Sequence, residues 1–185
     1  MPRRADCNQN VSRVPTDAGS MTSPMEQQFV YRQATPADIA GMSEVRACDW
    51  GTKEYWRDRI REYLAGELHP REALPSRVAF VCADQDRVLG LIAGHLTRRF
   101  GCAGELEWIS VRPEHRTQGI ASGLLRCLAQ WFLTHNARRI CVNVEPSNYA
   151  ARRFYTRHGA TYLTPHWMVW EDIGPVCAPA PDAGN

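Results

Sequence analysis

The sequence predicts a single-domain α/β fold, and three observations support this prediction. The chain has 185 residues, of which 44% are hydrophobic and 23% charged, enough to bury a core. β-rich runs alternate with segments whose apolar residues recur at helical spacing. Around Gly119, a strand is followed by a tight turn and then by a long helix.

Composition argues against several classes of protein. The 22 Lys and Arg residues face 20 Asp and Glu residues, leaving a net charge of +2, so no nucleic acid partner is expected. The seven cysteines are odd in number and include no CxxC pair, which argues against zinc and disulfides and favours a cytoplasmic location. The six histidines show no metal-like spacing, so no metal ion is expected. No apolar run could span a bilayer, so no membrane partner is expected.

Both ends of the chain are expected to be disordered. Residues 1–28 are polar and lack the apolar run of a signal peptide, and residues 174–185 are dominated by Pro, Ala and Gly. Residues 29–173 therefore form the predicted domain. The candidate start residues are Met1, Met21 and Met25.

The first half of the domain is expected to contain three strands and two helices. Thr35 can cap a helix, and Pro36 takes the first helical position, which proline favours. The turn-forming residues 84–86 separate two β-rich runs and indicate a hairpin. In order, the expected elements are a strand at 29–32, helices at 35–47 and 55–64, and strands at 77–83 and 87–96.

The second half is expected to contain four strands and two helices. The longer helix carries a continuous apolar stripe. Ser147 is expected to cap the shorter helix, and Gly159 to end it. In order, the expected elements are a strand at 105–111, a helix at 118–135, a strand at 139–145, a helix at 147–158, and strands at 162–163 and 167–172.

The turn before the long helix carries the clearest chemical signal. The helix opens on glycine and small residues, so its free backbone N–H groups and the positive end of its dipole face outward together, which suits a pyrophosphate. Gly119 lets phosphates approach the backbone, Ala121 keeps the next contact small, and Arg116 can add charge-assisted hydrogen bonds. The turn is neither a Walker loop nor a dinucleotide fingerprint, because it lacks Gly-Lys-Ser/Thr and a second glycine. Taken alone, R-x-x-G-x-A also fits the start of an ordinary core helix.

A second passage, residues 142–160, reads VNVEPSNYAARRFYTRHGA. Together with the glycine turn, it resembles the GNAT superfamily of N-acetyltransferases, whose motif R/Q-x-x-G-x-G/A is followed by a helix with N-x-x-A-x-x-x-Y. The resemblance covers about residues 29–172, and its specific motifs lie within residues 107–160.

The resemblance implies a GNAT-like mixed β-sheet that is splayed at its centre and flanked by helices. Acetyl-CoA, the implied cosubstrate, would lie between the strand ending at Val111 and the strand ending at Glu145. The strand end would contact the pantetheine arm and the acetyl carbonyl, and the turn would hold the pyrophosphate. The implied cofactor-binding residues are Ile109, Ser110, Val111, Arg116, Thr117, Gln118, Gly119, Ile120, Ala121, Ser122, Asn148 and Tyr155.

The resemblance also implies roles for two residues of the shorter helix. Tyr155 matches the tyrosine that serves as general acid for the departing thiolate, a role that a phenol can fill because it can hydrogen-bond the developing charge. The alternative is an aromatic core residue beside Phe154. Asn148 matches the asparagine that contacts the cofactor arm, and its alternative role is a cap-like residue beside Ser147.

Glu107 matches the position from which histone acetyltransferases of this family supply a glutamate base. Strand alternation would place Glu107, Ile109 and Val111 on one face, with Glu107 nearest the acceptor. Glu105 is the alternative base, and an ordinary solvated carboxylate is the alternative role for Glu107. Where the ribosomal-protein alanine acetyltransferases carry a glutamate, this chain has Asn143, so their substrate does not transfer.

The predicted activity is direct transfer of the acetyl group of acetyl-CoA to a primary amine of a small molecule or peptide. The alternative is a non-catalytic acyl-CoA-binding or sensor module of the same fold. A nucleotide-binding protein would need a lysine and a metal carboxylate that are absent from the turn. A nucleophilic cysteine is disfavoured because neither Cys127 nor Cys141 has a histidine partner in its sequence context. Both a monomer and a homodimer are compatible with the sequence.

Overall fold

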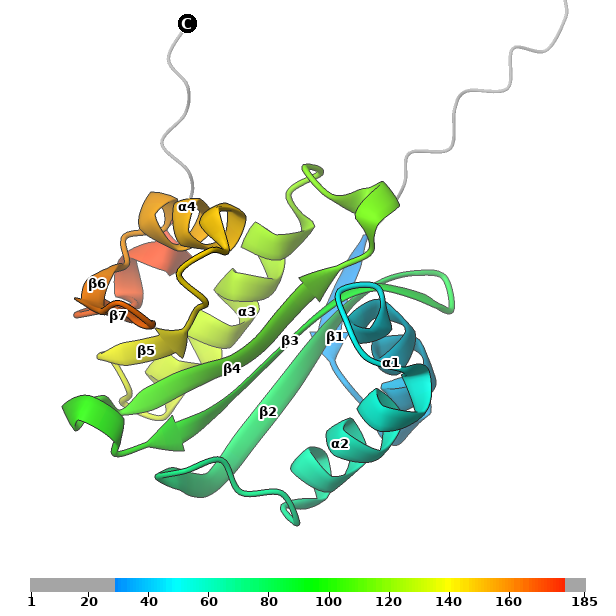
Figure 1. The fold of residues 1–185 in the computed structure, drawn as a ribbon, viewed down its shortest axis with the longest axis horizontal. Coiled ribbons are helices and arrows are strands. Elements are labelled where there is room, and N and C mark those ends of the chain that lie inside the picture. The colour runs from blue at the N-terminus through cyan, green and yellow to red at the C-terminus, as the bar shows by residue number, and fades with distance from the viewer. Residues whose placement is uncertain (1–28, 179–185) are drawn as a thin grey trace, which may run out of the picture.

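The computed structural model describes residues 29–178 as a seven-stranded sheet with helices on both faces (Figure 1). The strand order is β1-β2-β3-β4-β5-β7-β6, and the neighbouring strands are antiparallel except for the parallel pair β4 and β5. The predicted mixed sheet flanked by helices is therefore confirmed. The predicted leader, residues 1–28, lies outside the described residues, as does the end of the predicted tail from residue 179.

The strands differ strongly in length. The predicted hairpin is confirmed, and its two strands are the longest of the sheet. The strands are β1 (Val30–Gln33), β2 (Ala73–Asp84), β3 (Arg87–Thr97), β4 (Gly104–Val111), β5 (Ile140–Asn143), β6 (Thr161–Thr164) and β7 (Trp167–Trp170).

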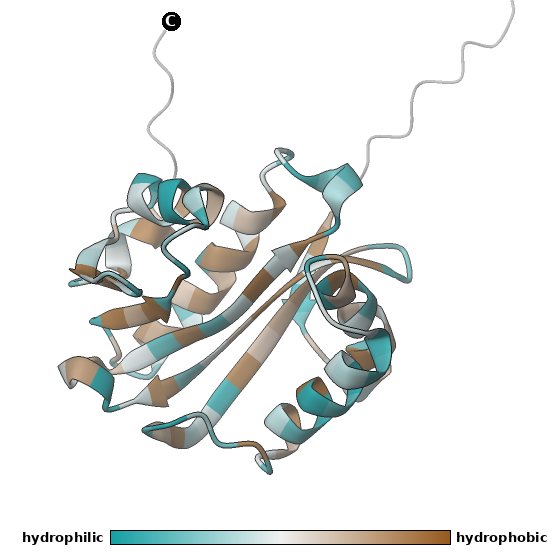
Figure 2. Cartoon of the chain, viewed as in Figure 1, coloured by the Kyte–Doolittle hydropathy of each residue, from teal (hydrophilic) through white to brown (hydrophobic). Residues whose placement is uncertain are grey.

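Helices cover both faces of the sheet, as Figure 1 shows. The helices are α1 (Ile39–Ala47), α2 (Lys53–Ala65), α3 (Ile120–Thr134) and α4 (Tyr149–Arg157). One apolar core lies between the sheet and the pair α1 and α2, and a larger one lies between the sheet and α3. Figure 2 shows apolar residues along the central strands and α3, and hydrophilic residues on much of α2 and α4. No helix within residues 29–178 is both long and apolar enough to cross a membrane.

The helix ends follow the sequence with one exception. Thr35 caps a short 3₁₀ turn that leads into α1, with Pro36 in its first position. Gly159 follows α4 with a φ of 90°, the left-handed conformation that glycine adopts readily. The prediction that Ser147 caps α4 is wrong. Asn148 caps this helix instead, because its side chain accepts the backbone N–H of Ala151 at 3.1 Å.

The sheet splays open between β4 and β5. The two strands pair only where Gly104–Leu106 run beside Ile140–Val142, and the rest of β4 continues without β5 as a partner. The predicted division of the sheet is confirmed. It leaves the carboxyl ends of two parallel strands apart, where α/β folds commonly bind ligands.

The domain extends slightly beyond its predicted end. Residues 174–177, expected to be disordered, form a 3₁₀ turn that opens with Gly174 and Pro175. Val176 is buried there in the core beneath α3, and Cys177 packs against the same core, so apolar contacts hold this turn on the domain.

Candidate active site

A cavity of about 940 Å³ lies where β4 and β5 diverge. It is lined by the ends of these strands, the first turn of α3, α4 and the segment after α1. We call it the cleft. The predicted site residues that line it are Glu107, Ile109, Ser110, Val111, Arg116, Thr117, Gly119, Ile120, Ala121, Ser122, Asn148 and Tyr155. Gln118 does not line it, and its side chain donates to the carbonyl of Glu114 at 3.3 Å.

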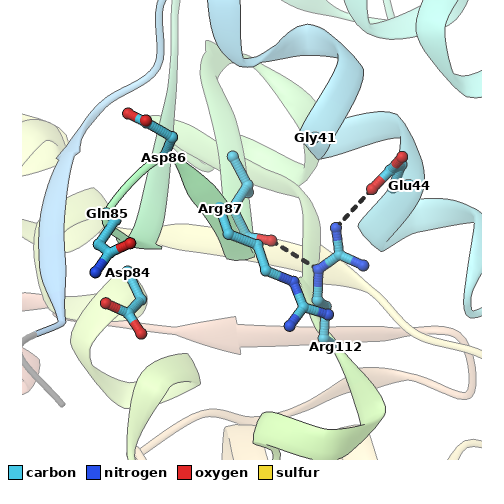
Figure 3. A pocket seen from close by; sticks show the side chains of 8 residues that line it. Gly41, Glu44, Asp84, Gln85, Asp86, Arg87 and Arg112 are labelled. Carbon is cyan, nitrogen blue, oxygen red and sulfur yellow. Dashed lines mark hydrogen bonds and ion pairs between the residues drawn. The ribbon is translucent and has the colours of Figure 1, made fainter.

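A second cavity, of about 430 Å³, lies between α1 and the β2–β3 turn (Figure 3). Its arginines are already engaged. Arg112 donates to Glu44 and to the carbonyl of Val88, both at 2.8 Å, and Arg87 pairs with Glu114 at 2.8 Å. None of the predicted site residues lines this cavity, so the cleft is the candidate active site.

The backbone of the glycine turn is shaped for an anion. Gly119 has a φ of 82°, and a Cβ built on it would meet nothing within 4 Å. Its carbonyl accepts the first helical bond of α3, from the N–H of Gly123 at 3.0 Å. The N–H groups of residues 120–122 therefore precede the helical bonding pattern and can serve a ligand. The left-handed conformation favours glycine at position 119, and the open space beside it is available to a ligand.

Arg116 lies at the mouth of the cleft and is held in place by the protein. Its Nε donates to the carbonyl of Val111 at 3.1 Å, and its Nη2 donates to Asp49 at 2.9 Å. The other oxygen of Asp49 accepts a bond from the hydroxyl of Ser110 at 2.6 Å. Asp49, which follows α1, thus connects the turn to strand β4.

Tyr155 belongs to both the core and the cleft. Only 4% of it is exposed, and its ring packs edge-on against Trp170, with centroids 5.6 Å apart. Burial raises the pKa of this phenol above its ordinary value, and the nearby charge of Arg46 opposes the rise. Tyr155 therefore remains protonated at neutral pH, and it lines the cleft.

Asn148 also lines the cleft while capping α4. The cap uses only its side-chain oxygen. The amide group is left to donate to a ligand. The two roles considered for Asn148 are therefore compatible.

A β-bulge places Glu107. Ala93 pairs with Trp108 and Gly94 pairs with Leu106, so Glu107 is one extra residue in β4. Its carboxylate lies within 4.8 Å of ligand atoms of His95 and Glu105, and His95 contacts Tyr63 of α2, so Glu107 lies on the α2 side of the sheet.

The predicted common face of Glu107, Ile109 and Val111 is therefore wrong. Ile109 and Val111 pack into the core beneath α3, on the other side of the sheet. The extra residue interrupts the strict alternation of side chains along the strand.

Glu107 is partly buried, unlike an ordinary solvated carboxylate. Removal from water raises its pKa above the usual value. Glu105 raises it further, whereas His95, Arg59 and Arg99 lower it. The balance makes Glu107 a stronger base than a free carboxylate, and it faces the cleft.

Glu105 has a structural environment and does not line the cleft. It is 4% exposed, and one of its oxygens accepts from Nε of Arg99 at 2.9 Å. The ligand atoms of His95, Glu105 and Glu107 lie within 4.8 Å of one another, a spacing compatible with a cation. Arg99 already supplies a positive charge there, so we assign no metal ion to this cluster.

Sequence reasoning missed Asp49 and two buried polar residues, Arg46 and His95. Arg46 is only 9% exposed, lines the cleft, and donates to the hydroxyl of Ser110 at 2.7 Å. The sequence does carry a signal for Arg46, because this charged residue follows Met42 and Val45 on the apolar face of α1. His95 is fully buried in a long apolar strand and contacts the hydroxyl of Tyr63 at 3.1 Å.

Neither cysteine considered as a nucleophile lines the cleft. Burial raises the pKa of both Cys127 and Cys141, which keeps their thiols protonated and unreactive.

The sequence matches the acetyltransferase (GNAT) family over residues 42–160. The chain therefore belongs to the GNAT acetyltransferase family, as the two motifs predicted. No protein with a curated description matches the sequence.

Solved structures share the fold. A GNAT-family protein from Desulfovibrio desulfuricans superposes with a TM-score of 0.64 at 15% identity, covering 77% of this chain and 97% of its own. The PaiA N-acetyltransferase from Thermoplasma acidophilum, in complex with coenzyme A, gives 0.61 at 16% identity, covering 78% and 99%. An acetyltransferase from Thermus thermophilus gives 0.59 at 19% identity, covering 77% and 94%. At these identities the likeness shows the fold alone.

Proposed function

We propose that this protein is an N-acetyltransferase that moves the acetyl group of acetyl-CoA to a primary amine. One observation carries the proposal. A single cleft presents an unblocked helix N-terminus on one side, and a partly buried carboxylate, Glu107, and a protonated phenol, Tyr155, further along.

The glycine turn would hold the pyrophosphate of acetyl-CoA. Gly119 leaves open space, the N–H groups of residues 120–122 can donate, and Arg116 would turn from Asp49 toward a phosphate. The unpaired part of β4 would run beside the pantetheine arm, with Asn148 opposite. Membership of the GNAT family and the coenzyme A in the complex of the PaiA enzyme support this use of the cleft.

Two side chains of this protein can carry the proton transfers that the reaction needs. The amine nitrogen forms a bond to the acetyl carbon, and the bond between that carbon and sulfur breaks. Glu107, directly or through water, takes the surplus proton of the amine. Tyr155 gives a proton to the departing sulfur, and solvent exchange restores both groups, so the products are an amide and CoA.

An assay of CoA release tests the proposal. The full chain is incubated with acetyl-CoA and a panel of small amines and peptides, and mass spectrometry detects the acetylated product. We expect CoA release that depends on one class of amine. Tight binding of acetyl-CoA without acetylation of any amine would instead identify a sensor module. Preferential binding of ATP would exclude both the acetyltransferase and the sensor module.

A further inference from the structure

Arg46 is an unusual cation because it is buried at the edge of the cleft. Its guanidinium stacks on Trp56, with Cζ 4.0 Å from the ring centroid, and donates to the hydroxyl of Ser110 at 2.7 Å. Its Nε has no hydrogen-bond partner among residues 29–178. Burying a charge is costly unless a partner of opposite charge compensates it.

The protein compensates Arg46 only in part. The nearest carboxylate is Asp49, 3.7 Å from Nη1 of Arg46, which is longer than a hydrogen bond. Asp49 directs one oxygen to Ser110 and the other to Arg116. Two guanidinium groups therefore share one carboxylate, and Arg46 retains the capacity to bind a second anion.

A carboxylate of opposite charge lies elsewhere in the same cleft. Glu107 and Arg46 both line it, yet no ion pair joins them in the described part of the chain. Aromatic packing connects the surroundings of the two groups. Arg46 rests on Trp56, and Trp56 packs edge-on, at 5.7 Å, against Trp108, the neighbour of Glu107 in β4. The cleft thus holds an acidic group and a basic group that influence each other's charge without forming a direct ion pair in the described residues.

We infer that the acceptor is an amino acid, whose amine approaches Glu107 while its carboxylate binds Arg46. This inference rests on the proposed acetyl transfer and adds the chemical class of the acceptor. A guanidinium binds a carboxylate through two parallel hydrogen bonds, which would turn the amine toward the base. The competing role for Arg46, stabilising the developing charge on the acetyl oxygen, would favour all amines equally.

The first experiment uses the unmodified protein. CoA release is measured with each of the standard amino acids and with the matching carboxamides, which keep the amine and side chain but lack the carboxylate. We expect one group of amino acids to exceed its carboxamides in kcat/KM by about 100-fold, because a buried cation left unpaired penalises the neutral analogue. Equal or better turnover of the carboxamides overturns the inference while the proposed acetyl transfer stands.

The second experiment changes Arg46. In Arg46→Gln, the ratio of kcat/KM between acid and carboxamide should fall to near one, and Arg46→Lys should give an intermediate ratio because it keeps the charge and loses the paired geometry. Arg57→Gln is the matched control, since Arg57 lies on the exposed surface of α2 beside Asp58 and should keep the wild-type ratio. An equal loss for both substrates in Arg46→Gln would assign Arg46 to the acetyl oxygen and overturn the inference.

Binding provides a readout that does not need turnover. The melting temperature of the chain with CoA is measured with and without each amino acid and carboxamide, and unliganded Arg46 variants are checked for folding in the same assay. We expect that the amino acids raise the melting temperature and that the carboxamides do not. The increase should be smaller in both Arg46 variants. Stabilisation without acetylation would reject the proposed transfer and keep the site, whereas no difference between acid and carboxamide would reject the site.

Discussion

The two sides of the cleft are built in different ways. The side formed by the glycine turn and the start of α3 offers mainly backbone groups from one short stretch of sequence, residues 116–122. The other part of the lining offers side chains from elements far apart in the chain, including Arg46 on α1 and Glu107 on β4. Phosphate binding needs only a local backbone shape, whereas orienting an amine needs side chains brought together by the whole fold.

This contrast predicts that one substitution in the glycine turn can abolish cofactor binding by the backbone groups. In Gly119→Glu, the side chain would strain the left-handed backbone and place a negative charge where the pyrophosphate should bind, so acetyl-CoA affinity should fall by more than about 100-fold. Calorimetric titration measures the loss.

Gly66→Glu is the matched control for this substitution. Gly66 has a φ of 81° and open space for a Cβ, but it ends α2 and does not line the cleft. The same strain should leave the affinity unchanged there. Normal binding by a folded Gly119→Glu protein would show that the turn is not the phosphate site.

The strand that carries Glu107 should depend for its stability on the ion pair between Glu105 and Arg99 behind the cleft. Glu105→Gln removes the partner of Arg99 inside the protein, so the free energy of unfolding should fall by about 3–5 kcal/mol in urea titrations. Glu171→Gln breaks a pair of similar geometry, between Glu171 and Nε of Arg139 at 2.8 Å, but on the surface. Its effect should be much smaller. Equal effects of the two substitutions would contradict the structural role of Glu105.

Tyr155 should affect turnover and leave cofactor binding intact. Because proton donation matters only as the sulfur departs, Tyr155→Phe should lower kcat by about 100-fold with little change in acetyl-CoA affinity. Tyr162→Phe, on the exposed edge strand β6, should match the wild type in both quantities. If kcat is unchanged when chemistry limits the rate, Tyr155 is a core residue only.

Glu107 should give the smallest and most pH-dependent effect, because water can partly replace a base. Glu107→Gln should lower kcat/KM by about tenfold where the amine is mostly protonated, and the deficit should shrink as pH approaches the pKa of the amine. The pH profile of kcat/KM for both proteins measures this. A uniform loss at every pH would point to binding or folding instead.

The pH dependence of stability provides a second test of the environment of Glu107. Its pKa is raised in the folded protein, so the wild type is stabilised as pH falls through this pKa and loses that contribution as pH rises. Glu107→Gln has no such ionisation. The difference in the free energy of unfolding, variant minus wild type, should therefore be highest at neutral pH and decrease on acidification. Urea unfolding of both proteins at neutral and at acidic pH measures this difference.

The sequence predicted most local features, apart from the cap of α4, and the family motifs predicted the division of the sheet, whereas the contacts of single buried side chains could not be predicted. The glycine turn, the hairpin and the cap glycine after α4 could be predicted because each depends on a few adjacent residues. The bulge at Glu107 could not, because its partner residues Ala93 and Gly94 lie in another strand. Arg46 carried a weak signal, a charge on an apolar helix face, but its contacts with Trp56 and Ser110 come from tertiary packing.

The bulge also determines which layer of the molecule the acidic group of β4 reaches. Opposite it, Gly94 has no room for a side chain, because a Cβ would lie 2.9 Å from the carbonyl of Glu105 and 3.0 Å from Leu128. The direction of Glu107 is therefore set by the number of residues in one strand rather than by its neighbours. Deleting Glu107 would restore regular pairing with β3 and keep Leu106 and Ile109 on the α3 side and Trp108 on the other, so the strand would lose its acidic group with every other side chain still in its layer.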